Sequence, residues 1–199
     1  MSGLTPRKLK ALETKKNILS TALKLFSEKG YDNVTIDDIA TKSGTSKGAF
    51  YNHFHSKYEI FLEKFKEIDE FYISYSKELE KETTEEAKLI SLFHAQLSYL
   101  ESHLGKDVIR TIYINGLIPN HGNFLSNKKR PYYGIVKNIV ETGQKSGEFH
   151  QDFSPEKVTD LLTRTTRGSL YDWCSYEDFA LREEGMYFLS LIIRGLRKS

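Results

Sequence analysis

Apolar residues recur every three or four positions along almost the whole chain, which is the period of an amphipathic α-helix. The first such stretch spans 14–29 and is followed by Gly30, a residue type that commonly ends helices. Its apolar stripe consists of Ile18, Ala22, Leu25 and Phe26. The stripe predicts a helix that buries one face against neighbouring elements.

Further segments carry the same period, and strand-like alternation of useful length does not occur. The predicted helices span 36–43, 46–54, 56–81, 85–104, 108–117, 131–145, 155–173 and 178–197. An irregular segment is expected over 120–130. The sequence therefore predicts an all-α fold.

Helix ends are marked by residues with local capping chemistry. Thr35 and Asp38 stand at the spacing of a capping box, in which a hydroxyl and a carboxylate bond to free N–H groups. Pro131 suits the first position of a helix. Gly143 and Gly147 are expected in the turn that leaves this helix.

The composition narrows the class of protein. Of the 199 residues 39% are hydrophobic, which suffices for a buried core. A run of about 18 or more apolar residues is missing, so no membrane span is expected. The N-terminus carries no apolar signal-peptide core, which favours a cytoplasmic protein. The single cysteine, Cys174, has no partner for a disulfide, and without a Cys/His cluster we expect neither metal nor cofactor.

The formal net charge of +2 averages two unlike regions. Residues 1–57 hold ten Lys and Arg against five Asp and Glu, a net charge of +5. Residues 58–199 hold 19 Lys and Arg against 22 Asp and Glu, a net charge of −3. This asymmetry predicts an N-terminal domain (1–57) that meets a polyanion and a larger C-terminal domain (58–199) that does not.

Residues 35–57 combine two short predicted helices with Gly44 between them. A tight turn between helices needs this residue type. Both helices have apolar inner faces, which the helix over 14–29 can cover. The pattern predicts a helix-turn-helix, whose second helix has the right diameter to enter the major groove of DNA.

The outward face of this second helix carries the candidate chemistry. With Phe50 at the core, a helical wheel turns outward Gly48, Tyr51, Asn52 and His55, with Lys47 on the flank. No acidic residue lies between Asp38 and Glu59, so the surface does not repel phosphates. Lysines here can neutralise phosphate charge, and asparagine can read a base edge.

The segment 14–57 resembles the DNA-binding domain of tetracycline-repressor (TetR) type regulators. The resemblance rests on two motifs at that family's spacing, Thr35-Ile36-Asp37-Asp38-Ile39-Ala40 and Gly44-Thr45-Ser46-Lys47-Gly48-Ala49-Phe50-Tyr51-Asn52-His53-Phe54. It implies a homodimeric transcriptional regulator, usually a repressor, that a small ligand releases from a palindromic operator. The predicted DNA contacts are Thr35, Thr45, Ser46, Lys47, Gly48, Ala49, Tyr51, Asn52, His53 and Lys57.

Three of these positions do not follow the family pattern in a simple way. Thr45 stands where the family often has valine, and its hydroxyl can seek a phosphate rather than the core. Asn52 occupies a variable readout position, so the operator sequence does not follow from the resemblance. His53 lies toward the flank of the wheel, where phosphate contact or half-buried packing is expected rather than base reading.

Aromatic residues are frequent in the C-terminal domain. Buried Tyr and Trp need hydrogen-bond partners, which a ligand cavity or an interface can provide. An ordinary core also shows aromatic residues at helical spacing, and this alternative stays open. The candidate ligand-binding residues are Tyr99, Tyr113, Tyr133 and Trp173. The expected effector is an apolar or aromatic small molecule, and a cation held over the rings is a further option.

The last two long helices are the candidate dimer interface. The expected rows are Val158, Leu161, Leu162, Thr165, Ser169 and Leu170 on the first helix and Phe179, Met186, Leu189, Ile192, Ile193 and Leu196 on the second. Gly168 and Gly195 permit the close approach of another helix. The alternative is that these helices only complete a monomeric core. The predicted helix over 56–81 joins the two domains, so a ligand in the second could alter operator affinity through it.

Three other classes of protein compete with a DNA-binding regulator. An enzyme lacks support, because His94, His103 and Cys174 have no partner at the spacing of a catalytic or metal motif. A redox-sensing regulator would need basic residues beside Cys174, whose nearest charged neighbour in sequence is Asp172. A helical structural or interaction protein would explain the last two helices but not the acid-free stretch.

Overall fold

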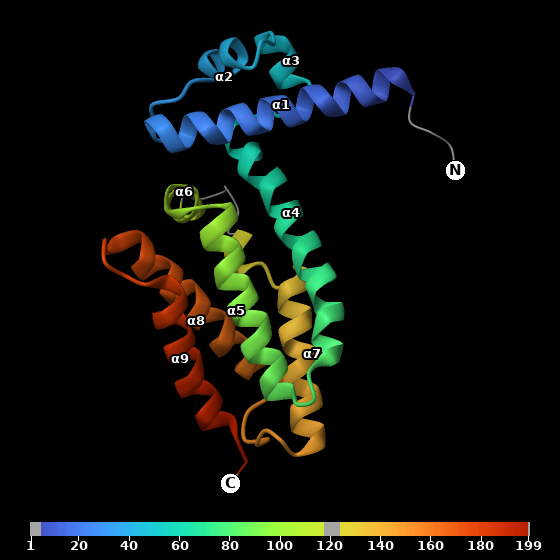
Figure 1. Ribbon diagram of the computed structural model, residues 1–199, viewed down its shortest axis with the longest axis vertical. Coiled ribbons are helices and arrows are strands. Elements are labelled where there is room, and N and C mark those ends of the chain that lie inside the picture. The colour runs from blue at the N-terminus through green and yellow to red at the C-terminus, as the bar shows by residue number, and fades with distance from the viewer. Residues whose placement is uncertain (1–4, 118–123, 199) are drawn as a thin grey trace. The chain divides into compact units, whose positions relative to one another are not determined.

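The structure, a computed structural model, describes residues 5–117 and 124–198 (Figure 1). Within these ranges the regular structure is helical, apart from one isolated β-bridge between Phe149 and Arg197. The predicted all-α fold is confirmed. The chain divides into two compact units, Met1–Phe65 and Lys66–Ser199.

The first unit is built on a long helix that carries two short ones. It contains α1 (Pro6–Lys29), α2 (Ile36–Lys42), α3 (Lys47–Tyr51) and the first residues of α4 (Lys57–Glu78). Helices α2 and α3 lie across α1 (Figure 1). The buried side chains that join them include Ile18, Ala22, Phe26, Ile39, Phe50, Phe54 and Phe61. This arrangement confirms the predicted helix-turn-helix with a covering first helix.

Local chemistry explains the ends of the short helices. The Thr35 hydroxyl accepts a hydrogen bond from the Asp38 N–H at 3.0 Å, and the Asp38 carboxylate accepts one from the Thr35 N–H at 2.8 Å. This is the predicted capping box at the start of α2. Gly44 follows α2 with φ +66°, a left-handed conformation that favours glycine.

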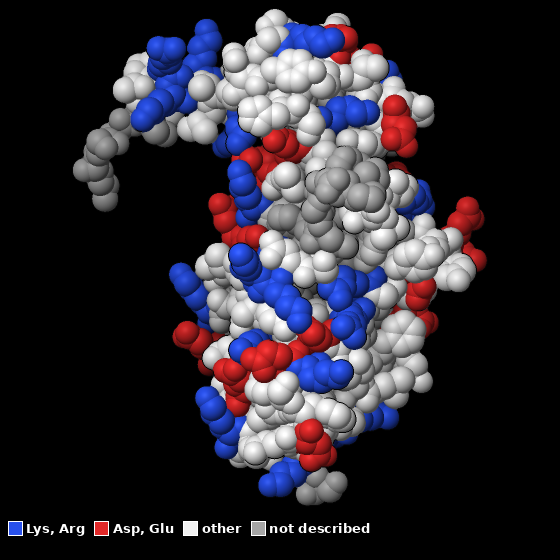
Figure 2. Space-filling model, turned by 180° about the vertical axis from the view of Figure 1, so that it is seen from behind, with Lys and Arg blue, Asp and Glu red and all other residues white. Residues whose placement is uncertain are grey.

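Two predicted helix ends in the first unit were wrong. Helix α1 begins at Pro6 rather than at position 14, because the Thr5 side chain caps it and Pro6 occupies a position in its first turn. These early turns lack the apolar stripe on which the prediction depended. Lys and Arg gather on this end of α1 (Figure 2). Helix α3 ends at Tyr51 instead of Phe54, where the N–H groups of both His53 and Phe54 bond to the Phe50 carbonyl.

The second unit is a bundle of the remaining helices. After α4 come η1 (Leu79–Lys81), α5 (Glu85–His103), α6 (Lys106–Gly116), η2 (Phe124–Ser126), α7 (Pro131–Ser146), α8 (Pro155–Ser175) and α9 (Leu181–Leu196). Helix α5 packs against α7 and α9, and α8 packs against α6, α7 and α9. The core includes Leu89, Leu92, Phe93, Val136, Val140, Leu162 and Leu189.

Other boundaries in this unit differ from the predictions by a few residues. Helix α9 begins at Leu181 rather than at position 178. Of the segment expected to be irregular, 120–123 lie outside the described residues, and part of the remainder forms the short helix η2. Pro131 takes the first position of α7, as predicted.

Two glycines of the second unit are required by packing. Gly143 was expected in a turn, but it lies inside α7, where an added Cβ would stand 2.3 Å from Cδ2 of the buried Phe149. An added Cβ at Gly185 would stand 2.6 Å from Leu97. The exit turn of α7 is made by Gly147 alone, at φ +80°.

Within residues 5–117 and 124–198, no helix is long and apolar enough to cross a membrane. No group of three or more His, Cys, Asp or Glu residues there is arranged to hold a metal ion.

Candidate DNA-binding surface and effector residues

Helix α3 is held in place by contacts at its start and beneath it. The Ser46 hydroxyl caps the helix by accepting a hydrogen bond from the Ala49 N–H at 3.0 Å. The Asn17 side chain of α1 donates to the Ser43 carbonyl at 2.8 Å and fixes the turn before α3. Phe50 is fully buried under the helix. The orientation of α3 is therefore set by the domain rather than by DNA.

The side chains opposite Phe50 face solvent, as the helical wheel predicted. Lys47, Gly48, Tyr51 and Asn52 are all exposed, and Tyr51 retains 44% of its accessible surface. Helix α3 carries no acidic residue. The outward face thus offers the ammonium group of Lys47, the phenol of Tyr51 and the amide of Asn52. Gly48 has no side chain, so the backbone is accessible there.

Lys47 is held by an ion pair beside this face. Its ammonium group lies 2.9 Å from a carboxylate oxygen of Asp37 in α2. Both side chains are more than half exposed, and the hydrogen bond with Asp37 raises the pKa of Lys47. The lysine is therefore charged, and a phosphate would have to compete with Asp37 for it.

Three predicted contact residues use their hydroxyl groups locally. Thr35 donates to Asp38 at 2.6 Å, and Thr45 shares a hydrogen bond with Ser43 at 2.9 Å. The Ser46 hydroxyl is engaged in the cap. Their contacts with DNA remain predictions, as do those of the half-buried Ala49 and His53.

Lys57, the last predicted contact, stabilises the domain itself. Its ammonium group donates to the carbonyls of Tyr31 at 2.8 Å and Val34 at 2.6 Å. It also lies 4.3 Å from the centre of the Tyr31 ring. Burial lowers the pKa of Lys57, an effect that Asp32 and Asp38 oppose. Lys57 therefore closes the loop between α1 and α2, and a phosphate contact remains a prediction.

The four candidate ligand-binding residues are anchored by separate partners. The Tyr99 ring stacks on Phe71 with centroids 4.1 Å apart. The Tyr113 hydroxyl donates to the Arg167 carbonyl at 2.5 Å, and Trp173 is buried. Their role in ligand binding stays a prediction.

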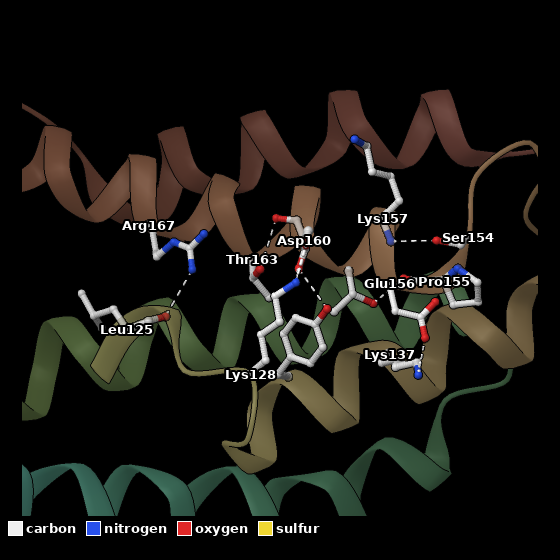
Figure 3. Close-up of polar contacts among 12 residues, drawn as sticks. Leu125, Lys128, Lys137, Ser154, Pro155, Glu156, Lys157, Asp160, Thr163 and Arg167 are labelled. Carbon is white, nitrogen blue, oxygen red and sulfur yellow. Dashed lines mark hydrogen bonds and ion pairs between the residues drawn. The ribbon is translucent and has the colours of Figure 1, made fainter. Parts of the chain in front are cut away.

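Tyr133, the fourth candidate, belongs to a charged cluster on the surface of α7 and α8. Its hydroxyl donates to Asp160 at 2.9 Å. Asp160 also pairs with Lys128 at 2.6 Å, and both are labelled in Figure 3. Lys137 pairs with Glu156 at 2.5 Å nearby. The hydroxyl is thus already satisfied, so Tyr133 has its ring rather than its polar atom to offer a ligand.

A buried polar chain inside the second unit was not predicted as a site. Gln96 of α5 donates to the Tyr72 hydroxyl at 3.1 Å and accepts from the Tyr132 hydroxyl at 2.6 Å. Thr166 of α8 donates to the same Gln96 oxygen at 3.2 Å. Burial raises the pKa of Tyr72 to about 12, so its hydroxyl stays protonated. The signal in the sequence was a glutamine at an apolar position of a predicted helix.

The geometry of the first unit defines a class of protein. A helix-turn-helix with a rigidly held, cationic and acid-free second helix is the form of a DNA-binding domain. A family model described as "Bacterial regulatory proteins, tetR family" matches residues 18–63. Residues 18–63 therefore carry the DNA-binding domain of this family, and the chain is a DNA-binding transcriptional regulator, not an enzyme.

Similarity to known proteins extends beyond this domain. The transcriptional repressor KstR2 of Mycolicibacterium smegmatis is 24% identical over 92% of this chain and 90% of its own. Thermus thermophilus FadR, a repressor solved with lauroyl-CoA, has a TM-score of 0.71 at 22% identity and covers 93% of this chain and 97% of its own. A Saccharomonospora viridis regulator solved with choline has a TM-score of 0.73 at 24% identity, with 94% and 99% covered.

Proposed function

We propose that the chain is a cytoplasmic homodimeric repressor that binds a palindromic operator through α3 and leaves it when a small apolar or aromatic effector binds the second unit. The outward face of α3 is the observation that carries the DNA-binding part. The name of KstR2, a repressor similar along nearly the whole chain, supports repression. Action on DNA supports the cytoplasmic location.

Selection of binding sites from random duplexes tests operator recognition. In the Asp37→Asn background, Lys47→Ala should weaken binding to every sequence and make the slope of log K against log salt shallower by about 0.9 per lost phosphate contact. This background is needed because Lys47→Ala alone would leave Asp37 unpaired beside the DNA. Asn52→Ala should instead relax the preference for one base pair. Failure of wild type to enrich any sequence would refute the proposal.

The proposed dimer interface is the outer face of α8 and α9. Added Cβ atoms at Gly168 and Gly195 would meet nothing within 4 Å, so both backbones are open to a second copy. Leu161 and Leu191 stay 48% and 47% exposed beside them. Surface hollows of about 300 and 350 Å³ lie along the same face and are lined mainly by apolar groups. A stable dimer must cover about 800 Å² on each partner, and such a face can supply it.

This face differs in part from the apolar rows expected on these helices. Side chains expected there that are buried within the monomer are Val158, Leu162, Ser169, Leu170, Leu189, Ile193 and Leu196. The outward row is Leu161, Thr165, Gly168, Leu191, Ile192 and Gly195. This outward row can contact a second copy, whereas the buried side chains cannot.

Sedimentation of full-length variants tests the interface. Leu161→Glu with Leu191→Glu should convert the dimer to monomer and abolish cooperative binding to a two-half-site operator. Ile90→Glu is the control, because Ile90 is 40% exposed on α5, away from this face. A dimer that survives the double substitution would place the interface elsewhere.

The effector can be sought through the single tryptophan, Trp173. Two relatives were solved with an acyl-CoA and with choline, so these compounds are suitable probes. We expect a true effector to change Trp173 fluorescence saturably and to release operator DNA over the same concentration range. If every fluorescence-active compound left operator affinity unchanged, ligand-controlled release would be refuted while DNA binding stood.

A further inference from the structure

The first turns of α1 extend beyond the compact part of the DNA-binding unit. All residues from Thr5 to Glu13 are exposed, and the first buried residue of α1 is Ile18. The family model also begins at residue 18. At 1.5 Å per residue, the segment from Pro6 reaches about 18 Å beyond Ile18. Because a solvated helical extension gains little from packing, its presence calls for another reason.

The charge of this extension is unfavourable for the helix itself. Its first turn contains no acidic residue, and Arg7, Lys8 and Lys10 stand where the helix dipole favours anions. Glu13 is the only acidic residue before Lys15. The cations gathered there are visible in Figure 2. Natural proteins tend to keep such locally unfavourable charges at functional sites, so these cations at the start of α1 call for a functional explanation.

Two of these cations lie on the side of α1 that bears the helix-turn-helix. The Asn17 side chain bonds to the Ser43 carbonyl and so marks this side. Lys10 and Arg7 precede Asn17 by seven and ten residues, which places both within a quarter turn of it on a helical wheel. Neither side chain has an ion pair or hydrogen-bond partner in the described chain.

Other cations of the extension point elsewhere. Lys8 precedes Asn17 by nine residues and lies on the opposite side, together with Lys15. Lys15 is occupied, since its ammonium group pairs with Glu63 of α4 at 2.6 Å. Lys16 lies about 100° from Asn17, on the side of the wheel away from Arg7. Glu13 precedes Asn17 by four residues and lies about 40° from it, on the same side as Arg7 and Lys10. The two cations outnumber this carboxylate, so the side of the extension that bears the helix-turn-helix has a net positive charge.

We propose that Arg7 and Lys10 bind backbone phosphates of the DNA that flanks the bases read by α3. The inference rests on the proposed function, because it requires α3 to hold an operator. Phosphates follow one another at about 3.4 Å along a strand, so an extension of about 18 Å can accompany about five base pairs. DNA is the favoured polyanion because Arg7 and Lys10 belong to the same compact unit as α3 and lie on the side of α1 that bears the helix-turn-helix.

The test compares two double variants of the full-length chain. Arg7→Gln with Lys10→Gln removes the proposed contacts, and Lys8→Gln with Lys16→Gln removes the same charge from other sides of the same turns. Glutamine keeps a helix propensity close to that of lysine and arginine. Each protein is titrated with the selected operator core and with the core extended by ten base pairs on each side, at several salt concentrations.

The proposed contacts give a distinct pattern. The Arg7/Lys10 variant should bind the extended duplex about tenfold or more weakly, with a salt slope shallower by about two per protomer. Its affinity for the operator core should be unchanged, and the Lys8/Lys16 variant should behave like wild type on both duplexes. Wild type itself should prefer the extended duplex.

Other results would overturn the inference. Equal losses in both variants would show that net charge alone matters. An Arg7/Lys10 variant that binds both duplexes like wild type would remove the contacts but leave the proposed function standing. Loss of binding to anionic lipid vesicles without any change on DNA would assign the extension to a membrane surface. If wild type bound no selected duplex, the inference and the proposed function would both fail.

Discussion

Lys57 offers a direct way to separate a structural role from a DNA contact. Its ammonium group satisfies two carbonyls of the α1–α2 loop, at 2.8 and 2.6 Å, and lies over the Tyr31 ring. Lys57→Met keeps the aliphatic stem but removes every one of these bonds. The partners are 26 and 23 residues away in sequence, so the contact ties the loop to the start of α4. The local bond from the Val34 N–H to the Tyr31 carbonyl, at 3.3 Å, stays within the loop and cannot do this.

The expected cost follows from these contacts. A hydrogen bond to a charged group contributes about 1.5–3 kcal/mol, and a cation over a ring adds about 0.5–1 kcal/mol at an exposed site. Because Lys57 is only half-buried, the loop carbonyls can recover water, and a total loss of about 2 kcal/mol is expected. For a unit of this size that loss lowers Tm by about 10 °C.

The assay follows thermal unfolding of the full-length protein by circular dichroism, with hydrogen exchange measured over residues 31–36. Lys57→Met should lower the first transition and speed exchange in this loop. The control is Lys47→Met, because its ion pair with Asp37 is exposed and screened by solvent, so its loss should leave Tm nearly unchanged. If Lys57→Met left Tm and exchange unchanged while weakening DNA binding, Lys57 would be a phosphate contact alone and the loop argument would be refuted.

Three more predictions concern the second unit. Gly143→Ala should destabilise it by about 1–3 kcal/mol in urea unfolding, because the buried Phe149 must move, whereas Gly134→Ala, open on the same helix, should be neutral or stabilising. Equal effects would refute the packing argument. Gln96→Leu should cost about 2–4 kcal/mol, since two buried tyrosine hydroxyls and a threonine lose their partner. An unchanged unfolding midpoint would show that water replaces the amide. Burial raises the pKa of Cys174 to about 11, so about one thiol in a thousand is ionised at pH 8 and iodoacetamide should label it slowly until the pH nears 11. Rapid labelling at pH 7.5 would favour the redox-sensor alternative.

Local patterns predicted most of the helices and the exposed face of α3. The capping box at Thr35 and the left-handed Gly44 depend on neighbours within four residues, so the sequence alone reveals them. The early start of α1 was missed because a solvated helix has no apolar stripe to detect. Its signals were instead a threonine cap and Pro6, which are weaker evidence without periodicity.

The roles of several site residues could not be predicted, because their partners are distant in sequence. Lys57 was expected on a phosphate, which stays a prediction, and in the structure it donates to carbonyls contributed by another loop. Lys47 was expected to neutralise a phosphate, and the sequence did not indicate that Asp37 of the preceding helix forms an ion pair with it. Residue type and helical position indicate which way a side chain leaves the backbone. They do not indicate which distant group it meets.

The Gln96 chain limits how the second unit can rearrange. One amide connects Tyr72 of α4, Tyr132 of α7 and Thr166 of α8, and each bond weakens steeply when its donor and acceptor move out of line. If a helix slid gradually along its neighbours, these buried polar groups would lose their hydrogen-bond partners in a place that water does not reach. Motion of α4 relative to the bundle is therefore restricted to positions in which a complete set of partners forms again. Such an interior moves between discrete registers, as a two-position switch does, rather than bending by degrees.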